Sequence, residues 1–195
     1  MKWLTIVGVG EDGYDGLLAR ARLAIAEADV IVGSERLLAF LPDSNAERHE
    51  WPQPFSAVVE RITPLRGRKT VILATGDPLN YGVARKLMTF IPFAEMQIIP
   101  QLSAFSLAAS RVGWSLPDCD THTLHGRHAA NIEAFIQPDV RLLVLTEDAS
   151  TITEVARRLV ARGFGKSQMI VLENMGGPRE RQSSFTAEAV PHMDF

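Results

Sequence analysis

The chain has one cysteine in 195 residues, so no internal disulfide can stabilise it. Cys119 fits a reducing compartment, with a buried structural thiol as its expected role. No apolar run approaches the roughly 20 residues that a membrane span needs. The first residues also lack the longer apolar segment of a signal peptide. These absences favour a globular, cytoplasmic protein.

The chain also lacks a large excess of positive or negative charge. The formal net charge is −3 and the isoelectric point is about 6.0. Neither value gives an overall electrostatic reason to bind nucleic acid or an anionic membrane. An anionic partner would therefore have to meet a local group of basic side chains. The apolar content of 46% suffices for one large domain or two small ones.

What the chain does contain is a regular alternation of apolar runs and helix-like segments. Runs rich in Val, Ile and Leu predict buried strands at residues 4–9, 30–32, 70–74, 96–99, 142–145 and 169–172. Helices are predicted at residues 17–28, 34–40, 57–65, 83–89, 103–112, 129–135 and 151–161. Such alternation predicts an α/β fold with parallel strands.

The helix at residues 151–161 has the clearest end signals. Thr151 and Glu154 have the spacing of a capping box, and Gly163 stands where a left-handed C-terminal residue belongs. The turn at residues 113–118 follows a long helix and precedes a change of pattern. We therefore expect an N-terminal domain at residues 1–114 and a C-terminal domain at residues 115–195.

The end of the sequence is unusual for a closing sheet. A predicted strand at residues 181–186 is followed by no further apolar strand before Phe195. We expect the second domain to lack its last strand and the chain to be part of a longer, bifunctional protein.

A glycine-rich loop follows the first predicted strand. Gly8, Gly10 and Gly13 match the G-x-G-x-x-G fingerprint of dinucleotide-binding folds, and Glu35 could serve as the ribose-binding acid. Glu11 and the aspartate after it would repel a pyrophosphate, however. The glycines leave a nucleotide-dependent oxidoreductase as one alternative, and the acids leave a purely structural turn with solvated carboxylates as another.

Two further strand-to-helix turns point to the same edge of the predicted sheet. The run Thr75-Gly76-Asp77-Pro78 has no cation beside its aspartate, so a phosphate is not its expected ligand. Asp77 would border a ligand, cap the next helix, or do both. Ser103 is the expected N-cap after the strand at residues 96–99. Because ligands of open α/β folds bind at the carboxyl edge of the sheet, three converging turns predict a cofactor cleft.

Three histidines, His122, His125 and His128, lie in one short segment. On a strand, His122 and His125 would face opposite sides, and no carboxylate or thiol completes a ligand set, so a metal is not expected. Arg127 is a candidate anion contact, with a surface turn as an equally weighted alternative. No spacing of nucleophile and base supports covalent catalysis.

Taken in order, these motifs resemble those of the tetrapyrrole (corrin/porphyrin) methylase family. The resemblance covers nearly the whole chain and rests on the runs Ile6-Val7-Gly8-Val9-Gly10, Thr75-Gly76-Asp77-Pro78 and Ile99-Pro100-Gln101-Leu102-Ser103-Ala104-Phe105. The run Leu124-His125-Gly126-Arg127 resembles the corresponding motif in the branch of the family that methylates precorrin-6Y during cobalamin biosynthesis. The chain departs from the family at Gln101, where a glycine is frequent, and at His128, where a proline is expected.

The resemblance implies two α/β domains with S-adenosylmethionine in the cleft between them. This cofactor carries no phosphate, which agrees with the acidic loops. Carried over position by position, the motifs place the cofactor at Gly10, Glu11, Gly76, Asp77, Asn80, Ser103, Ala104, Thr146 and Glu173. The polycarboxylate substrate, precorrin-6Y, would be methylated at carbon 5. Arg127 and Arg111 would anchor it, with His125 as a candidate base.

The resemblance also implies partners. A Rossmann-type unit, separate or fused C-terminally, would perform the methylation of carbon 15 and the decarboxylation, and the chain would form a homo-oligomer. Neither nucleic acid nor a membrane is an expected partner. A third interpretation is a noncatalytic domain that presents a tetrapyrrole to another protein.

Overall fold

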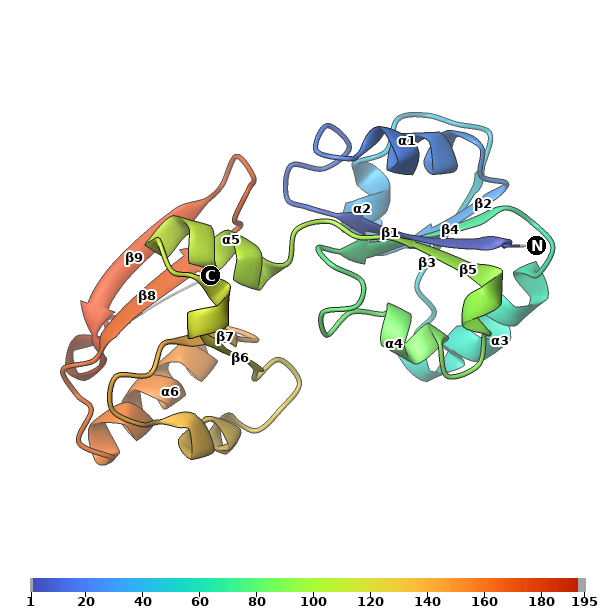
Figure 1. Cartoon of the computed structure of the whole chain (residues 1–195). Coiled ribbons are helices and arrows are strands. Elements are labelled where there is room, and N and C mark those ends of the chain that lie inside the picture. The colour runs from blue at the N-terminus through green and yellow to red at the C-terminus, as the bar shows by residue number, and fades with distance from the viewer. Residues whose placement is uncertain (1, 193–195) are drawn as a thin grey trace. The chain divides into compact units, whose positions relative to one another are not determined.

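The computed structural model describes residues 2–192 and divides the chain into two compact units (Figure 1). The first unit runs to Ser103 and includes Gly176–Pro178; the second holds Ala104–Met175 and the residues from Arg179 onward. The division precedes the helix at residues 104–112, whereas the sequence places it after that helix. The reason is packing, because Phe105 of this helix buries against Leu143 of the second unit. The sequence predicts no further strand between residue 186 and Phe195, and the last three of these residues lie outside the part of the chain that the structure describes.

The first unit is built on a five-stranded sheet with the order β3-β2-β4-β1-β5, in which every neighbouring pair is parallel. Its strands are β1 (Leu4–Val9), β2 (Val30–Gly33), β3 (Glu47–Glu50), β4 (Thr70–Thr75) and β5 (Met96–Ile99). The central strands β1 and β4 are almost continuously apolar. Strands of this composition are stable where both faces of the sheet are covered.

Helices cover both faces of this sheet (Figure 1). They are α1 (Ala19–Ala26), α2 (Glu35–Ala39), α3 (Val58–Ile62) and α4 (Ala84–Leu87). Side chains alternate along β1, so Ile6 packs with Ile62 of α3 and Leu87 of α4. Its neighbour Val7 packs with Ile25 of α1 on the other face.

The second unit contains two smaller, two-stranded sheets. Strands β6 (Asp120–Thr123) and β7 (Leu142–Leu145) are parallel, and β8 (Gln168–Glu173) and β9 (Arg181–Thr186) are antiparallel. Its helices are α5 (Ala104–Val112) and α6 (Ala149–Ala161). Leu143 packs with Phe105 of α5 in one apolar cluster. Val144 packs against a second cluster, which contains Val155 of α6. Of the helices in residues 2–192, none is both long and apolar enough to cross a membrane.

Short 3-10 helices connect these elements. They are η1 (Phe55–Ala57), η2 (Thr63–Leu65), η3 (Phe93–Glu95), η4 (Leu116–Asp118), η5 (Ala129–Phe135) and η6 (Ala187–Ala189). The sequence predicts an ordinary helix where η5 is found. His128 caps η5, since its Nδ1 accepts a hydrogen bond from the Ala130 amide at 3.1 Å.

The capping box predicted for the helix at residues 151–161 is wrong. Helix α6 begins at Ala149, and Asp148 is its N-cap: Asp148 Oδ1 accepts a hydrogen bond from the Thr151 amide at 2.9 Å. Glu154 pairs with Arg157 on its own helix instead of reaching back to the cap. The predicted left-handed conformation of Gly163 is confirmed by its φ of 85°.

Candidate functional site

Three turns meet at the carboxyl edge of the first unit's sheet. They follow β1, β4 and β5, which are neighbours in the sheet. A Cβ added to Gly8 would lie 2.1 Å from the carbonyl oxygen of Gly76 and 2.6 Å from the amide nitrogen of Gln101. The end of β1 is therefore in direct contact with the backbones of the turns after β4 and β5. The three turns converge on one edge of the sheet, as the sequence predicts.

The glycines of the first turn are used for packing. Gly8 makes the close approach just described, and Gly13 has a φ of 61°. A Cβ on Gly13 would lie 3.1 Å from the ring of Phe40, and one on Gly10 would lie 2.4 Å from Asp12 Oδ1. The fingerprint glycines thus allow close packing against the neighbouring turns, the loop's own Asp12 and the ring of Phe40.

Glu11, in the same turn, is charge-paired. Arg36 Nη1 lies 2.5 Å from Glu11 Oε1, and Arg36 Nη2 lies 3.4 Å from Thr75 Oγ1. Arg36 is placed by the first turn of α2, which Ser34 caps, and its guanidinium also lies over the ring of Phe40. Arg36 therefore links the ends of three strands. Sequence reasoning missed this contact, for which the only signal is the position of Arg36 just after β2.

The second turn winds around Asp77. Asp77 Oδ1 accepts a hydrogen bond from the Leu79 amide at 2.9 Å, and the Asn80 amide donates to the Asp77 carbonyl at 3.1 Å. Helix α4 begins only at Ala84, so Asp77 closes a turn and does not cap the helix. Gly76 permits this turn through its φ of 60°. Asp77 and Asn80 are both half-buried.

Gln101 joins the third turn to the first. Its Nε2 donates to the Gly16 carbonyl at 2.8 Å, and its Oε1 accepts from the Leu102 amide at 3.1 Å. Where the family often has glycine, this chain thus has a side chain that braces two turns. Ser103, two residues further along the chain, is buried, and Ala104 begins α5.

In the second unit, three of the predicted residues, His125, Arg127 and Thr146, follow β6 and β7. The turn after β6 is held by Glu147, whose Oε2 accepts a hydrogen bond from the Gly126 amide at 3.2 Å. This bond joins the turn of His125 and Arg127 to the loop of Thr146. The side chains of His125 and Arg127 are exposed, and Thr146 is half-buried.

His122 is a packing residue. Its ring centroid lies 3.5 Å from that of Phe135, and its Nε2 is buried without a hydrogen-bond partner. It pairs in register with Val144, whereas His125 lies beyond the strand in the exposed turn. In residues 2–192, no group of three His, Cys, Asp or Glu side chains could hold a metal ion.

Two of the predicted ligand contacts in the second unit are already paired. Arg111 binds Glu180 through both Nε and Nη2, the latter at 2.8 Å from Glu180 Oε2, and this hydrogen bonding raises the pKa of Arg111. The side chain of Glu173 is only 11% exposed and lies 2.6 Å from Arg181 Nη2. Each would have to share or exchange its partner to bind a ligand.

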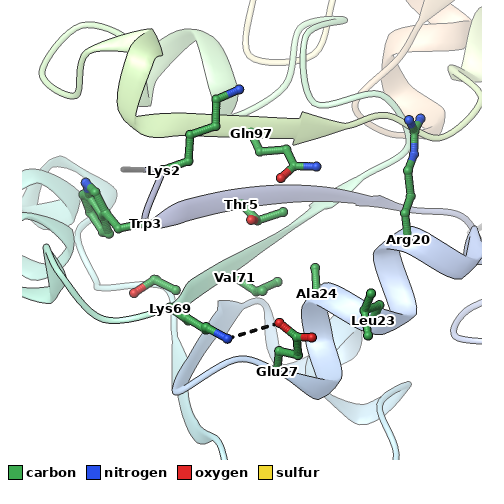
Figure 2. Close-up of a pocket in the computed structure, with 11 residues that line it drawn as sticks. Lys2, Trp3, Thr5, Arg20, Leu23, Ala24, Glu27, Lys69, Val71 and Gln97 are labelled. Atoms are coloured by element: carbon green, nitrogen blue, oxygen red, sulfur yellow. Dashed lines mark hydrogen bonds and ion pairs between the residues drawn. The ribbon is translucent and has the colours of Figure 1, made fainter.

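A hollow of about 310 Å³ lies elsewhere on the first unit (Figure 2). Residues of the amino-terminal halves of β1, β4 and β5 line it, together with α1 and an ion pair of 3.1 Å between Lys69 and Glu27. None of the predicted site residues borders it. Because ligands of open α/β sheets bind at the carboxyl edge, we do not place the cofactor in this hollow.

Two curated relatives resemble the chain over almost all of its length. A precorrin-6Y C(5,15)-methyltransferase [decarboxylating] from a Sinorhizobium species is 41% identical over 92% of the chain. The chain spans only 44% of that protein, less than half its length. A cobalt-precorrin-7 C(5)-methyltransferase from Salmonella typhimurium is 32% identical over 91% of the chain and 88% of its own length.

A solved structure shows the same fold. The cobalamin-biosynthesis precorrin-6Y methylase from Archaeoglobus fulgidus superposes with a TM-score of 0.73 and 27% identity, covering 97% of the chain and 92% of its own. The model of the family described as Tetrapyrrole (Corrin/Porphyrin) Methylases matches residues 3–191. Both findings agree with the ordered motifs and with the turns that meet at the sheet edge. The chain therefore belongs to the tetrapyrrole methylase family.

Proposed function

We propose that the chain is an S-adenosylmethionine-dependent methyltransferase of cobalamin biosynthesis that acts on carbon 5 of a precorrin. One observation carries the choice of carbon. The chain spans 44% of a relative named for carbons 5 and 15, but 88% of one named for carbon 5 alone. The segment that both relatives share with this chain is the one expected to methylate carbon 5. Methylation of carbon 15 and decarboxylation would then belong to a partner unit, fused or separate.

The chemistry of the first unit's edge supports this cofactor. Residues 10–18, 76–83 and 100–103 contain no Lys or Arg, and Arg36, which reaches them, is engaged by Glu11. A pyrophosphate favours nearby positive charge, which the side chains of these turns do not supply. S-adenosylmethionine has a sulfonium, an ammonium and one carboxylate, so carboxylates and backbone groups suit it. The oxidoreductase alternative is not favoured.

We assign the cofactor to the residues at which the family motifs place it. In the first unit these are Gly10, Glu11, Gly76, Asp77, Asn80 and Ser103, and in the second Ala104, Thr146 and Glu173. Asp77 and Asn80 are suited to this role because their turn is fixed by its own hydrogen bonds. Binding would then need little ordering of the protein.

When bound, S-adenosylmethionine would supply a methyl group to an electron-rich carbon of the ring. The contribution of the chain is to align the two molecules and exclude water. Arg127 is suited to hold a carboxylate arm of the substrate, since guanidinium binds carboxylate in bidentate fashion. Arg111 could do so after releasing Glu180. His125, exposed in the same turn as Arg127, is the candidate acceptor of the proton that the methylated carbon loses.

The test is a transfer assay with enzymatically prepared precorrin and S-adenosylmethionine labelled with 13C in the methyl group. We expect one labelled methyl per ring, located at carbon 5 by NMR. A label at another carbon would refute the assignment, and substrate binding without transfer would favour the noncatalytic alternative. Arg127→Ala should weaken substrate binding and leave binding of S-adenosylhomocysteine unchanged.

A further inference from the structure

Large apolar side chains are exposed on the two turns that follow β4 and β5. Leu79 and Tyr81 are 52% and 49% exposed, and Leu102 is 58% exposed. The two turns adjoin, because a Cβ on Gly76 would lie 3.3 Å from the carbonyl oxygen of Leu102. We call Leu79, Tyr81 and Leu102 the apolar rim. Apolar groups concentrated on neighbouring turns at one edge are a typical feature of a binding surface.

The backbone under the rim is tightly constrained. The Leu79 amide bonds to the Asp77 carboxylate, and a Cβ on Gly82 would lie only 2.4 Å from the Pro78 carbonyl oxygen. Tyr81 has a φ of 57°, a left-handed conformation in which bulky residues are uncommon. An asparagine or glycine would adopt it at lower cost. The presence of a tyrosine in this left-handed conformation indicates that the side chain of Tyr81 has a role of its own.

We propose that the apolar rim is the surface against which the tetrapyrrole ring of the substrate lies. This inference rests on the proposed function and assigns residues to its second ligand. S-adenosylmethionine is compact and largely polar, so the carboxylates and backbone groups assigned to it above suit it better than exposed apolar side chains do. A tetrapyrrole is broad, with apolar faces and carboxylates at its periphery, and so matches apolar side chains held on constrained turns.

The location of the rim agrees with the reaction. Leu79 and Tyr81 belong to the same turn as Gly76 and Asp77, and Leu102 directly precedes Ser103. A ring on these side chains would therefore lie beside the residues assigned to the methyl donor. Transfer requires this adjacency, because the reacting atoms must approach to about 3–3.5 Å.

The test is a fluorescence titration with uroporphyrin III, a stable planar octacarboxylate porphyrin. The variants are the double substitution Leu79→Ser with Leu102→Ser, and Tyr81→Asn, which retains a residue suited to the left-handed backbone. We expect uroporphyrin affinity to fall about tenfold or more for the double variant. The affinity for S-adenosylhomocysteine should stay within about twofold of wild type.

Phe93→Ser is the matched control. Phe93 is 63% exposed in η3 of the same unit, but it precedes β5 and so lies away from the carboxyl edge. Uroporphyrin affinity that is unchanged in the rim variants, or equally reduced in Phe93→Ser, would overturn the inference. So would a change of oligomeric state in the rim variants with no loss of porphyrin affinity, since the rim would then be a contact between copies. Failure of the wild-type chain to bind S-adenosylhomocysteine would contradict the proposed function instead.

Discussion

The two units follow the same alternation of strands and helices, but they bury their strands to different degrees. In the first unit Leu4, Ile6 and Val7 of β1 are fully buried between helices on both faces of a five-stranded sheet. In the second unit every residue of β8 after Gln168 is only half-buried, and each sheet has two strands. Two-stranded sheets are marginally stable unless other elements cover them. The first unit therefore owes more of its stability to its strands.

The difference extends to how the candidate site residues are held. In the first unit, backbones in direct contact at Gly8 and Gly76 fix the turns. In the second unit, ion pairs hold the candidate site residues: Glu180 pairs with Arg111, and Arg181 pairs with Glu173. Substitutions of glycine should therefore be most harmful in the first unit, and substitutions of charged residues should be informative in the second.

The largest expected effect is that of Gly8→Ala. The new Cβ would overlap the Gly76 carbonyl and the Gln101 amide, and backbone atoms cannot move aside cheaply. We expect the free energy of unfolding in urea to fall by about 3 kcal/mol or more. The control is Gly67→Ala, where nothing lies within 4 Å and the positive φ alone should cost about 1–2 kcal/mol. Equal losses for the two variants would mean that the turns are not packed as described.

A matched pair of core truncations measures the difference in strand burial. Ile72 of β4 is fully buried, whereas Ile170 of β8 is half-buried. Ile72→Ala should cost about 4 kcal/mol, near the upper end for such truncations, and Ile170→Ala about 1–2 kcal/mol. Urea unfolding followed by circular dichroism gives both values. If Ile170→Ala cost as much as Ile72→Ala, the proposed contrast between the units would be wrong.

The ion pair at the first unit's edge should matter more for binding than for stability. Glu11→Gln removes the charge that pairs with Arg36, and a partly exposed pair contributes at most about 1 kcal/mol to folding. We expect the affinity for S-adenosylhomocysteine, measured by calorimetry, to fall several-fold. Glu27→Gln is the control, because Glu27 pairs with Lys69 outside the assigned site. Equal affinity in both variants would remove Glu11 from the cofactor site.

The smallest effect expected is the pH dependence of the cap on α6. Hydrogen bonds from the Ser150 hydroxyl, and then from the Thr151 amide, lower the pKa of Asp148. A carboxyl group whose pKa is lowered on folding stabilises the folded state fully above its unfolded pKa, near 4, and less as the pH falls through the lowered pKa. Asp148→Asn keeps a capping side chain but removes this titration. Its stability relative to wild type should therefore rise as the pH falls below about 4.

The measurement for this cap is thermal unfolding at several pH values between about 2 and 7, because this interval spans the titration of a carboxyl group. Asp43→Asn, on an exposed residue outside the helices, is the control. A stability difference between wild type and Asp148→Asn that is constant with pH would show that the charge of Asp148 does not contribute to the cap.

Much of the first unit can be predicted from the sequence, because its apolar strands leave a direct pattern. The prediction misses β3 and β6, whose sequences Glu-Arg-His-Glu and Asp-Thr-His-Thr contain no apolar run. Strand β3 lies at the edge of its sheet, so it forms through backbone pairing with β2 and needs no buried face. The start of α6 is misplaced because Asp148 competes successfully with Thr151 for the cap.

The turns of the candidate site are predictable for a different reason. Each consists of residues close together in sequence, and the order of the strands brings the turns to one edge. The pairs of Arg36 with Glu11 and Arg111 with Glu180 join residues that are 25 and 69 positions apart. Local patterns carry no signal for such pairs, so they require the structure.

We propose that the turns of the first unit bind a methyl donor and not a dinucleotide. Calorimetric titration of the wild-type chain and of Asp77→Ala with S-adenosylhomocysteine and with NAD tests it most directly. We predict binding of S-adenosylhomocysteine to the wild type, at least tenfold weaker binding to Asp77→Ala, and no binding of NAD to either. Binding of NAD, or no binding of S-adenosylhomocysteine to the wild type, would contradict the claim.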